Sequence, residues 1–273
     1  MKKIAFVVQR YGNEVVGGSE FLCKQIAEHL SHNYQIEILT TCAIDYITWR
    51  NDYPEGNQIE QNVLIRRFKT EKERRLKPFQ NLTLRIFNNP HTELDERYWF
   101  EEQGPYSPKL LEYIEMHKNC YDTFIFFTYR YYQSIFGLPL VYDKSILIPT
   151  AEDEDTMKLE ILKNFFKLPK AFIFLTPEEQ DMINKIYEIN TKLQDIIGLG
   201  LDIPQDIDMH RFSKKFNIND DYLLYVGRID PQKGCNRLFD YFSRYKKKYP
   251  TKTKLILIGK TTIEIPKNDD IIY

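Results

Sequence analysis

The chain has 273 residues, of which 42% are hydrophobic and 14% aromatic, so it can form one large globular domain or two smaller ones. Its 38 lysines and arginines are balanced by 39 aspartates and glutamates, which excludes a global attraction to nucleic acid and restricts any basic site to a local cluster. The first apolar run is only about five residues long, against ~7–15 for a secretory signal, and no run reaches the ~18 that span a membrane.

Cysteine and histidine positions give no sign of a disulfide framework or a metal site. The cysteines lack a Cys-x-x-Cys pair, and neither they nor the histidines have zinc spacing. We therefore expect buried, reduced thiols in a cytoplasmic protein. The cysteines are Cys23, Cys42, Cys120 and Cys235.

The first two hundred residues predict repeated strand–helix–strand units around a parallel sheet. Short β-branched and aromatic runs alternate there with longer amphipathic segments. We expect Ser19 to cap the first helix, with Phe21 and Leu22 in its apolar stripe, and Thr176 to cap a later helix that begins at Pro177. The expected strands are 3–8, 35–41, 63–68, 123–128, 145–150 and 171–176, and the expected helices are 19–30, 107–117 and one from 177.

Between Lys69 and Glu102 the periodicity is poor, which predicts a long excursion with some helix. The basic segment RRFKTEKERRLK (66–77) at its start has two interpretations. It lies on a membrane surface beside an acceptor, or it is the solvated face of a helix. The interleaved Glu71 and Glu73 favour the second interpretation.

The segment DIIGLGLDIP (195–204) predicts a junction between an N-terminal domain of residues 1–200 and a second domain of residues 201–273. After it the pattern restarts, with a strand at 223–229, a helix at 234–249 and a strand at 254–260. So short a second domain does not complete a doubly wound sheet. We therefore expect a truncated chain or a fragment of a longer protein.

One stretch of the second domain, YVGRIDPQKG, concentrates charge where a strand gives way to a helix. Gly227 and Arg228 end the strand, and Lys233 and Gly234 open the helix. Ligands of open α/β sheets bind at the carboxyl ends of strands, and two cations beside a helix start suit a diphosphate. The alternative is an ordinary corner whose arginine and lysine are merely solvated.

This stretch closely resembles the donor-binding signature of family 4 (GT4, group 1) glycosyltransferases, retaining enzymes of the two-domain GT-B fold. VVGGSE (15–20) resembles their glycine-rich loop, and TPEEQ followed by GLGLDIP resembles the segment that leads into their interdomain linker. These motifs occur in the expected order over most of the chain. The resemblance implies an α/β fold with a Rossmann-like acceptor-side domain and an incomplete Rossmann-like domain that binds a nucleotide sugar.

The same resemblance implies an activity and the residues that carry it. The implied reaction moves a sugar from a UDP- or GDP-linked donor to a saccharide or lipid-linked acceptor with retention of configuration. It needs no metal or other cofactor. The implied role is cell-surface polysaccharide synthesis, with contact at the inner membrane face. Family members usually carry two glutamates further downstream, so we expect this fragment to lack part of the catalytic apparatus. The implied residues are Arg228 and Lys233 on the diphosphate, Gly227, Gly234 and Gly259 beside the donor, and Gly17 and Gly18 facing the cleft.

On the acceptor side, FFTYRYYQS (126–134) places Tyr129 and Arg130 at the end of a buried strand. An aromatic face suits a sugar ring and an arginine suits an anionic acceptor, whereas the alternative is tyrosines packed under a loop. Glu152 and Asp153 follow the next strand and are also expected on the acceptor side. Several GT4 relatives carry a histidine near the position of Glu152, where this chain has a glutamate.

Three alternatives remain open at this point. Asp153 and Asp155 form a D-x-D after a strand, as in metal-dependent GT-A glycosyltransferases that hold Mn²⁺ or Mg²⁺, although the same carboxylates also suit a helix start. The basic turn favours GT-B. A non-catalytic sugar-nucleotide-binding or interaction domain, or a nucleotide-sugar epimerase, would share the fold.

Overall fold

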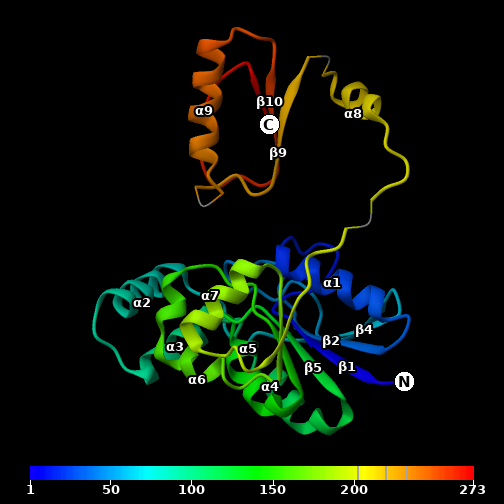
Figure 1. The fold of residues 1–273 in the computed structure, drawn as a ribbon, viewed down its shortest axis with the longest axis vertical. Coiled ribbons are helices and arrows are strands. Elements are labelled where there is room, and N and C mark those ends of the chain that lie inside the picture. Colours follow the sequence, from blue (N-terminus) through cyan, green and yellow to red (C-terminus); the bar gives the residue numbers. More distant parts are fainter. Residues whose placement is uncertain (202, 219, 232) are drawn as a thin grey trace. The chain divides into compact units, whose positions relative to one another are not determined.

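The structure is a computed structural model that describes residues 1–201, 203–218, 220–231 and 233–273 (Figure 1). The chain divides into two compact units, Met1–Leu201 and Asp202–Tyr273. Asp202 of the GLGLDIP segment and Gln232 of the basic turn lie outside the described residues. The functional roles expected for the two domains stay predictions.

The first unit is built on one eight-stranded sheet. Its strands are β1 (Lys3–Val7), β2 (Gln35–Thr41), β3 (Gly56–Glu60), β4 (Val63–Phe68), β5 (Thr123–Phe127), β6 (Ser145–Ile148), β7 (Ala171–Phe174) and β8 (Leu193–Ile196). Its helices are α1 (Gly18–Leu30), α2 (Leu76–Asn88), α3 (Glu93–Gln103), α4 (Pro108–His117), α5 (Tyr132–Gly137), α6 (Glu160–Phe165) and α7 (Pro177–Tyr187), with short 3₁₀ turns η1 (Lys118–Cys120), η2 (Leu138–Lys144) and η3 (Asp155–Lys158).

The strand order of this sheet contains a topological switch point. The order is β3-β4-β2-β1-β5-β6-β7-β8, and only β3 runs antiparallel to its neighbour. From β1 the chain moves outward through β2 and β4 on one side, then returns to pair β5 with β1 and moves outward on the other side. Ligands of such sheets bind outside the carboxyl ends of the two strands where the order reverses. The segments that follow β1 and β5 therefore mark the functional edge of this unit.

Alternate residues of the strands pack into two separate hydrophobic cores, because successive side chains point to opposite faces of a sheet. Ala5 and Val7 of β1 pack into a cluster with α2 to α7, whereas Phe6 packs into a cluster with α1 on the other face (Figure 1). Continuous apolar runs are typical of strands covered on both sides. The predicted parallel sheet with helices on both faces is confirmed.

The start of α1 differs from the expectation. Gly17, not Ser19, occupies the N-cap position, and no side chain caps this helix. The Ser19 hydroxyl instead donates to Glu20 Oε2 at 2.9 Å. Phe21, expected in the apolar stripe, is 43% exposed because the buried face of the helix passes through Leu22 and Cys23. The Thr176 cap is confirmed, since its hydroxyl accepts the amide of Glu179 at 3.1 Å.

The basic segment 66–77 is not the solvated helix face that we expected. Its first residues belong to β4 and only its last two begin α2. Arg67 is 2% exposed and donates to the Tyr11 carbonyl at 3.1 Å. Arg74 donates to the carbonyls of Tyr46 and Ile47 at 2.5 and 2.7 Å. These two guanidinium groups therefore join loops of the first unit.

The second unit contains β9 (Tyr222–Val226), β10 (Lys254–Ile258) and β11 (Ile271–Ile272) in a parallel sheet of order β11-β10-β9, with α8 (Met209–Phe216) and α9 (Cys235–Lys248). Phe239 and Phe242 of α9 pack against Leu255 and Leu257 of β10, so one face of the sheet is covered. None of the helices in the described parts of either unit is long and apolar enough to cross a bilayer.

Candidate functional site

At the switch point, a buried ion pair organises the glycine-rich loop. Arg10 follows β1 and Glu20 lies in the first turn of α1, and both side chains are 6% exposed. Arg10 Nε donates to Glu20 Oε1 at 2.9 Å, and its Nη1 donates to the carbonyl of Ile44 after β2 at 2.6 Å. One guanidinium thus connects the ends of two strands to the start of a helix. A buried charge requires such complete pairing.

The two glycines of VVGGSE have different environments. A Cβ atom on Gly17 would lie 2.1 Å from Glu20 Oε2 and 3.1 Å from Arg10 Nη2, so the ion pair fills the space that a side chain needs. A Cβ atom on Gly18 would have no neighbour within 4 Å. Packing inside the unit therefore explains Gly17. Of the two positions expected to face the cleft, Gly18 is the one that leaves open space beside it.

One carboxylate, that of Glu154, holds Tyr129 and Arg130 in the segment that follows β5. The Tyr129 hydroxyl donates to Glu154 Oε1 at 2.5 Å, and Arg130 Nη1 donates to Glu154 Oε2 at 2.6 Å. Burial, followed by the charge of Glu154, raises the pKa of Tyr129, so its phenol stays a hydrogen-bond donor. Tyr129 is fully buried and packs against Phe166, so in this conformation its ring offers no face to a sugar.

Arg130 is the member of this group that reaches the surface. Its side chain is 33% exposed, and its buried Nε has no hydrogen-bond partner in the described part of the chain. The exposed part of its guanidinium, rather than the buried Nε, is what could meet a polar ligand at this strand end. The expected role of Arg130 toward an acceptor stays a prediction.

Sequence reasoning missed a pair of strained threonines at the same edge. Thr128 after β5 has φ 65° and Thr150 after β6 has φ 48°, both in the left-handed region that β-branched residues rarely enter. Their hydroxyl oxygens lie 2.9 Å apart. Such strain is frequent where function fixes the backbone. The sequence carries no signal for it, because the strain arises from the meeting of two loops that are distant in the chain.

Glu152 and Asp153 are exposed on the loop between β6 and η3. Asp155, the second acid of the D-x-D, pairs with Lys158 at 2.7 Å on the surface. In the described part of the chain, no group of three or more histidine, cysteine, aspartate or glutamate side chains is arranged to hold a metal ion.

A second carboxylate, Glu179, joins the loops after β6 and β7. Its two oxygens accept the amides of Ala151 at 2.7 Å and Leu175 at 2.9 Å. It is 6% exposed, and burial raises its pKa although both amide hydrogen bonds lower it. Together with Glu154, it fixes the loop that carries Glu152 at both ends.

In the second unit, two glycines bring the ends of β9 and β10 together. The Gly227 amide donates to the Ile258 carbonyl at 2.9 Å. A Cβ atom on Gly259 would lie 1.9 Å from the Gly227 carbonyl oxygen, and Gly259 has φ 143°. Only glycine fits at position 259 without displacing backbone. The expected donor-side glycines thus have a clear structural role at the carboxyl edge.

The basic turn brings the two predicted diphosphate ligands onto one short loop. Arg228 is 38% exposed and its Nη2 lies 3.2 Å from Asp230 Oδ2. Asp230 Oδ1 accepts the amide of Lys233 at 2.8 Å, and the Lys233 side chain is exposed. Gly234 then adopts φ 76° as the N-cap of α9. Sequence reasoning did not find this role of Asp230, because the contact with the Lys233 amide depends on how the turn folds.

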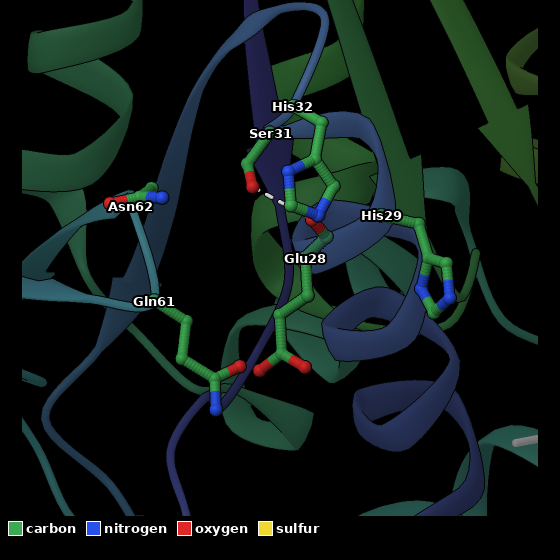
Figure 2. Close-up of a pocket in the computed structure, with 6 residues that line it drawn as sticks. All are labelled: Glu28, His29, Ser31, His32, Gln61 and Asn62. Atoms are coloured by element: carbon green, nitrogen blue, oxygen red, sulfur yellow. Dashed lines mark hydrogen bonds between the residues drawn. The ribbon is translucent and has the colours of Figure 1, made fainter.

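The pocket in Figure 2 lies elsewhere. It is lined by the C-terminal end of α1 and by the turn between β3 and β4, and the figure shows the Gln61 amide facing the Glu28 carboxylate. These segments precede β2 and β4, so the pocket lies at the amino-terminal edge of the sheet. It has no part in the candidate site. Its other lining residues are His29, Ser31, His32 and Asn62.

No protein-family model matches this chain, and no curated protein matches it in sequence. Solved structures do resemble it. Sucrose-phosphate synthase from Thermosynechococcus elongatus matches 99% of this chain with a TM-score of 0.64 and 14% identity. HepE from Anabaena, in complex with UDP and glucose, matches 96% with a TM-score of 0.59 and 14% identity. A UDP-forming trehalose-phosphate synthase from Burkholderia vietnamiensis matches 96% with a TM-score of 0.55 and 10% identity.

These likenesses show the fold. The chain has the α/β architecture of GT-B glycosyltransferases, as expected, and not that of the GT-A alternative. It spans 64%, 62% and 64% of the three matched chains, which is less than two thirds of each.

Proposed function

We propose that this chain belongs to a glycosyltransferase that moves a sugar from a nucleotide-sugar donor to a saccharide or lipid-linked acceptor. The observation that carries the proposal is the turn on which Arg228 and Lys233 follow β9 within a GT-B fold. The finer assignments are GT4 membership, retention of configuration, a role in cell-surface polysaccharide synthesis and contact with the inner membrane face. They rest on the motif resemblance of VGRIDPQKG and VVGGSE.

The chemistry of the turn fits the departure of a nucleoside diphosphate. Negative charge grows on the diphosphate as the glycosidic bond breaks, and cations fixed beside it stabilise that state more than the ground state. The planar guanidinium of Arg228 binds two oxygens, whereas the ammonium of Lys233 is a mobile point charge. Uridine is the base we propose first, because HepE binds UDP-glucose and the trehalose-phosphate synthase forms UDP.

The acceptor is proposed to enter at the switch point of the first unit. Gly18 leaves open space there, and the Arg130 side chain is 33% exposed at the end of β5. Glu152 and Asp153 are exposed at the end of the neighbouring strand. A carboxylate at this edge is suited to accept a proton from an attacking hydroxyl.

A thermal-shift panel tests the donor site. UDP, GDP, ADP and UDP-glucose are added to the wild type, Arg228→Ala and Lys233→Ala, with Mg²⁺ or with EDTA. We expect UDP and UDP-glucose to raise the melting temperature equally in both buffers, and each substitution to abolish most of the rise. Arg244→Ala is the matched control, because Arg244 pairs with Asp240 on the exposed face of α9.

Three results would count against the proposal. Equal shifts in wild type and Arg228→Ala would place the nucleotide elsewhere, and a shift that requires Mg²⁺ and is lost in Asp153→Ala would favour metal-dependent binding. Absence of any shift would refute nucleotide binding by this chain. Release of glucose or a glucoside from UDP-glucose then separates an enzyme from a binding module, because the module holds the donor without turnover.

A further inference from the structure

Asp230 contacts both arms of the basic turn with a single carboxylate. Its Oδ2 lies 3.2 Å from Arg228 Nη2, and its Oδ1 accepts the Lys233 amide at 2.8 Å. We propose that Asp230 is a positioning residue, which orients Arg228 and the start of the Lys233 segment for an incoming diphosphate. This inference rests on the proposed function.

The burial of Asp230 supports a specific role. The residue is 5% exposed, and burying a carboxylate is costly unless hydrogen bonds and an opposite charge compensate. Both oxygens are engaged, one by a guanidinium and the other by a backbone amide. The neighbours Pro231 and Lys233 are exposed, so the turn buries the one acid that joins the two cationic positions.

Other contacts fix the backbone of the turn independently of Asp230. The Arg228 carbonyl accepts the Tyr225 hydroxyl at 2.6 Å, and the Cys235 thiol lies 3.8 Å from the same oxygen. Burial raises the pKa of Tyr225 to about 12, so its hydroxyl remains a donor at neutral pH. Loss of the Asp230 charge therefore affects the Arg228 side chain first and leaves the strand end in place.

The effect on binding follows from side-chain ordering. An arginine that loses a charged partner samples more rotamers, and ordering it when the ligand binds weakens affinity by a factor of about 2 to 10. Asp230→Asn keeps an oxygen for the Lys233 amide but presents an amide in place of the charge that holds Arg228. Asp230→Ala removes both contacts and should weaken binding further.

The test uses the full chain, with inorganic pyrophosphate and UDP as separate probes in isothermal titration calorimetry. Asp230→Asn is compared with Asp240→Asn, which removes an equivalent charge from the exposed Asp240–Arg244 pair of α9. We expect Asp230→Asn to weaken both ligands about fivefold and Asp240→Asn to leave them unchanged. In an Arg228→Ala background, Asp230→Asn should have no further effect, because its action passes through that side chain.

The outcomes separate this inference from the proposed function. Unchanged or tighter binding in Asp230→Asn, with wild-type binding intact, refutes the positioning role alone, and tighter binding would mean that Asp230 competes with the ligand for Arg228. An equal loss in the Arg228→Ala background also refutes it, since the effect would then be general to the turn. Failure of the wild type to bind either probe refutes the donor site itself.

Discussion

The adjacent glycines Gly17 and Gly18 should respond in opposite ways to the same substitution. Gly17→Ala places a Cβ atom 2.1 Å from Glu20 Oε2, whereas Gly18→Ala places one in open space. The two variants add the same methyl group to neighbouring positions at the start of α1. They therefore isolate the effect of the buried Arg10–Glu20 pair.

The magnitude follows from the distance that Glu20 must move. Ordinary contact begins near 3.4 Å, so the carboxylate must shift by about 1.3 Å. A carboxylate on the surface would move at little cost, but this one accepts hydrogen bonds from Arg10 and Ser19, and its side chain is 6% exposed. Overpacking costs about 1–3 kcal/mol, and complete loss of a buried ion pair costs about 3–5 kcal/mol. We expect Gly17→Ala to lower the free energy of unfolding by about 3 kcal/mol.

Gly18→Ala should raise the same quantity by up to about 0.5 kcal/mol, because alanine loses less backbone freedom than glycine in a helix. Urea unfolding followed by tryptophan fluorescence measures both effects. The only two tryptophans, Trp49 and Trp99, lie buried in the first unit, so the signal reports the unfolding of that unit. Similar stabilities for the two variants, or a Gly17→Ala loss below about 1 kcal/mol, would contradict the steric argument.

Further predictions concern backbone contact, pH and thiol access. Gly259→Ala should destabilise the second unit by at least about 3 kcal/mol, because the new Cβ atom would overlap the Gly227 carbonyl oxygen. Hydrogen exchange of the backbone amides in β9 and β10 measures this effect, and unchanged exchange rates would argue against it. Burial raises the pKa of Glu37, but hydrogen bonds from Lys3 and Arg66 outweigh burial and hold the pKa below the usual range of a glutamate. The stabilisation from these contacts is therefore present above the ordinary glutamate pKa and is lost as pH falls through the lowered value. Glu37→Gln should therefore flatten the acid side of the stability profile, and an unaltered profile would refute the assignment. Among the four cysteines only Cys120 is exposed, so one thiol per chain should react rapidly with a disulfide reagent in the native state, and three or four rapid reactions would contradict this burial.

The strands and the basic turn were predictable because their signals are local. An uninterrupted apolar run such as FIFF (124–127) indicates a strand covered on both faces, and β5 is such a strand. The spacing of Arg228 and Lys233 around a turn proline likewise depends on a few consecutive residues. Burial of all four cysteines was wrong, because Cys120 lies in a short exposed turn after α4.

The remaining features depend on contacts between distant segments. Strand β3 is exposed along nearly its whole length and carries no apolar alternation, so only its pairing with β4 defines it. Gly17 resembled a ligand-facing glycine, yet the Arg10–Glu20 pair explains it. Such a pair is formed by the packing of α1 beside the end of β1, which neither segment reveals alone.

The loop after β6 is fastened on both sides of its exposed acids. Glu179 accepts the Ala151 amide before them, and Glu154 is held by Tyr129 and Arg130 after them. The two positions between these anchors, 152 and 153, are therefore free to vary in charge and size at little cost to folding. Libraries confined to these two positions would therefore vary the charge at this edge of the sheet while leaving the anchoring contacts in place.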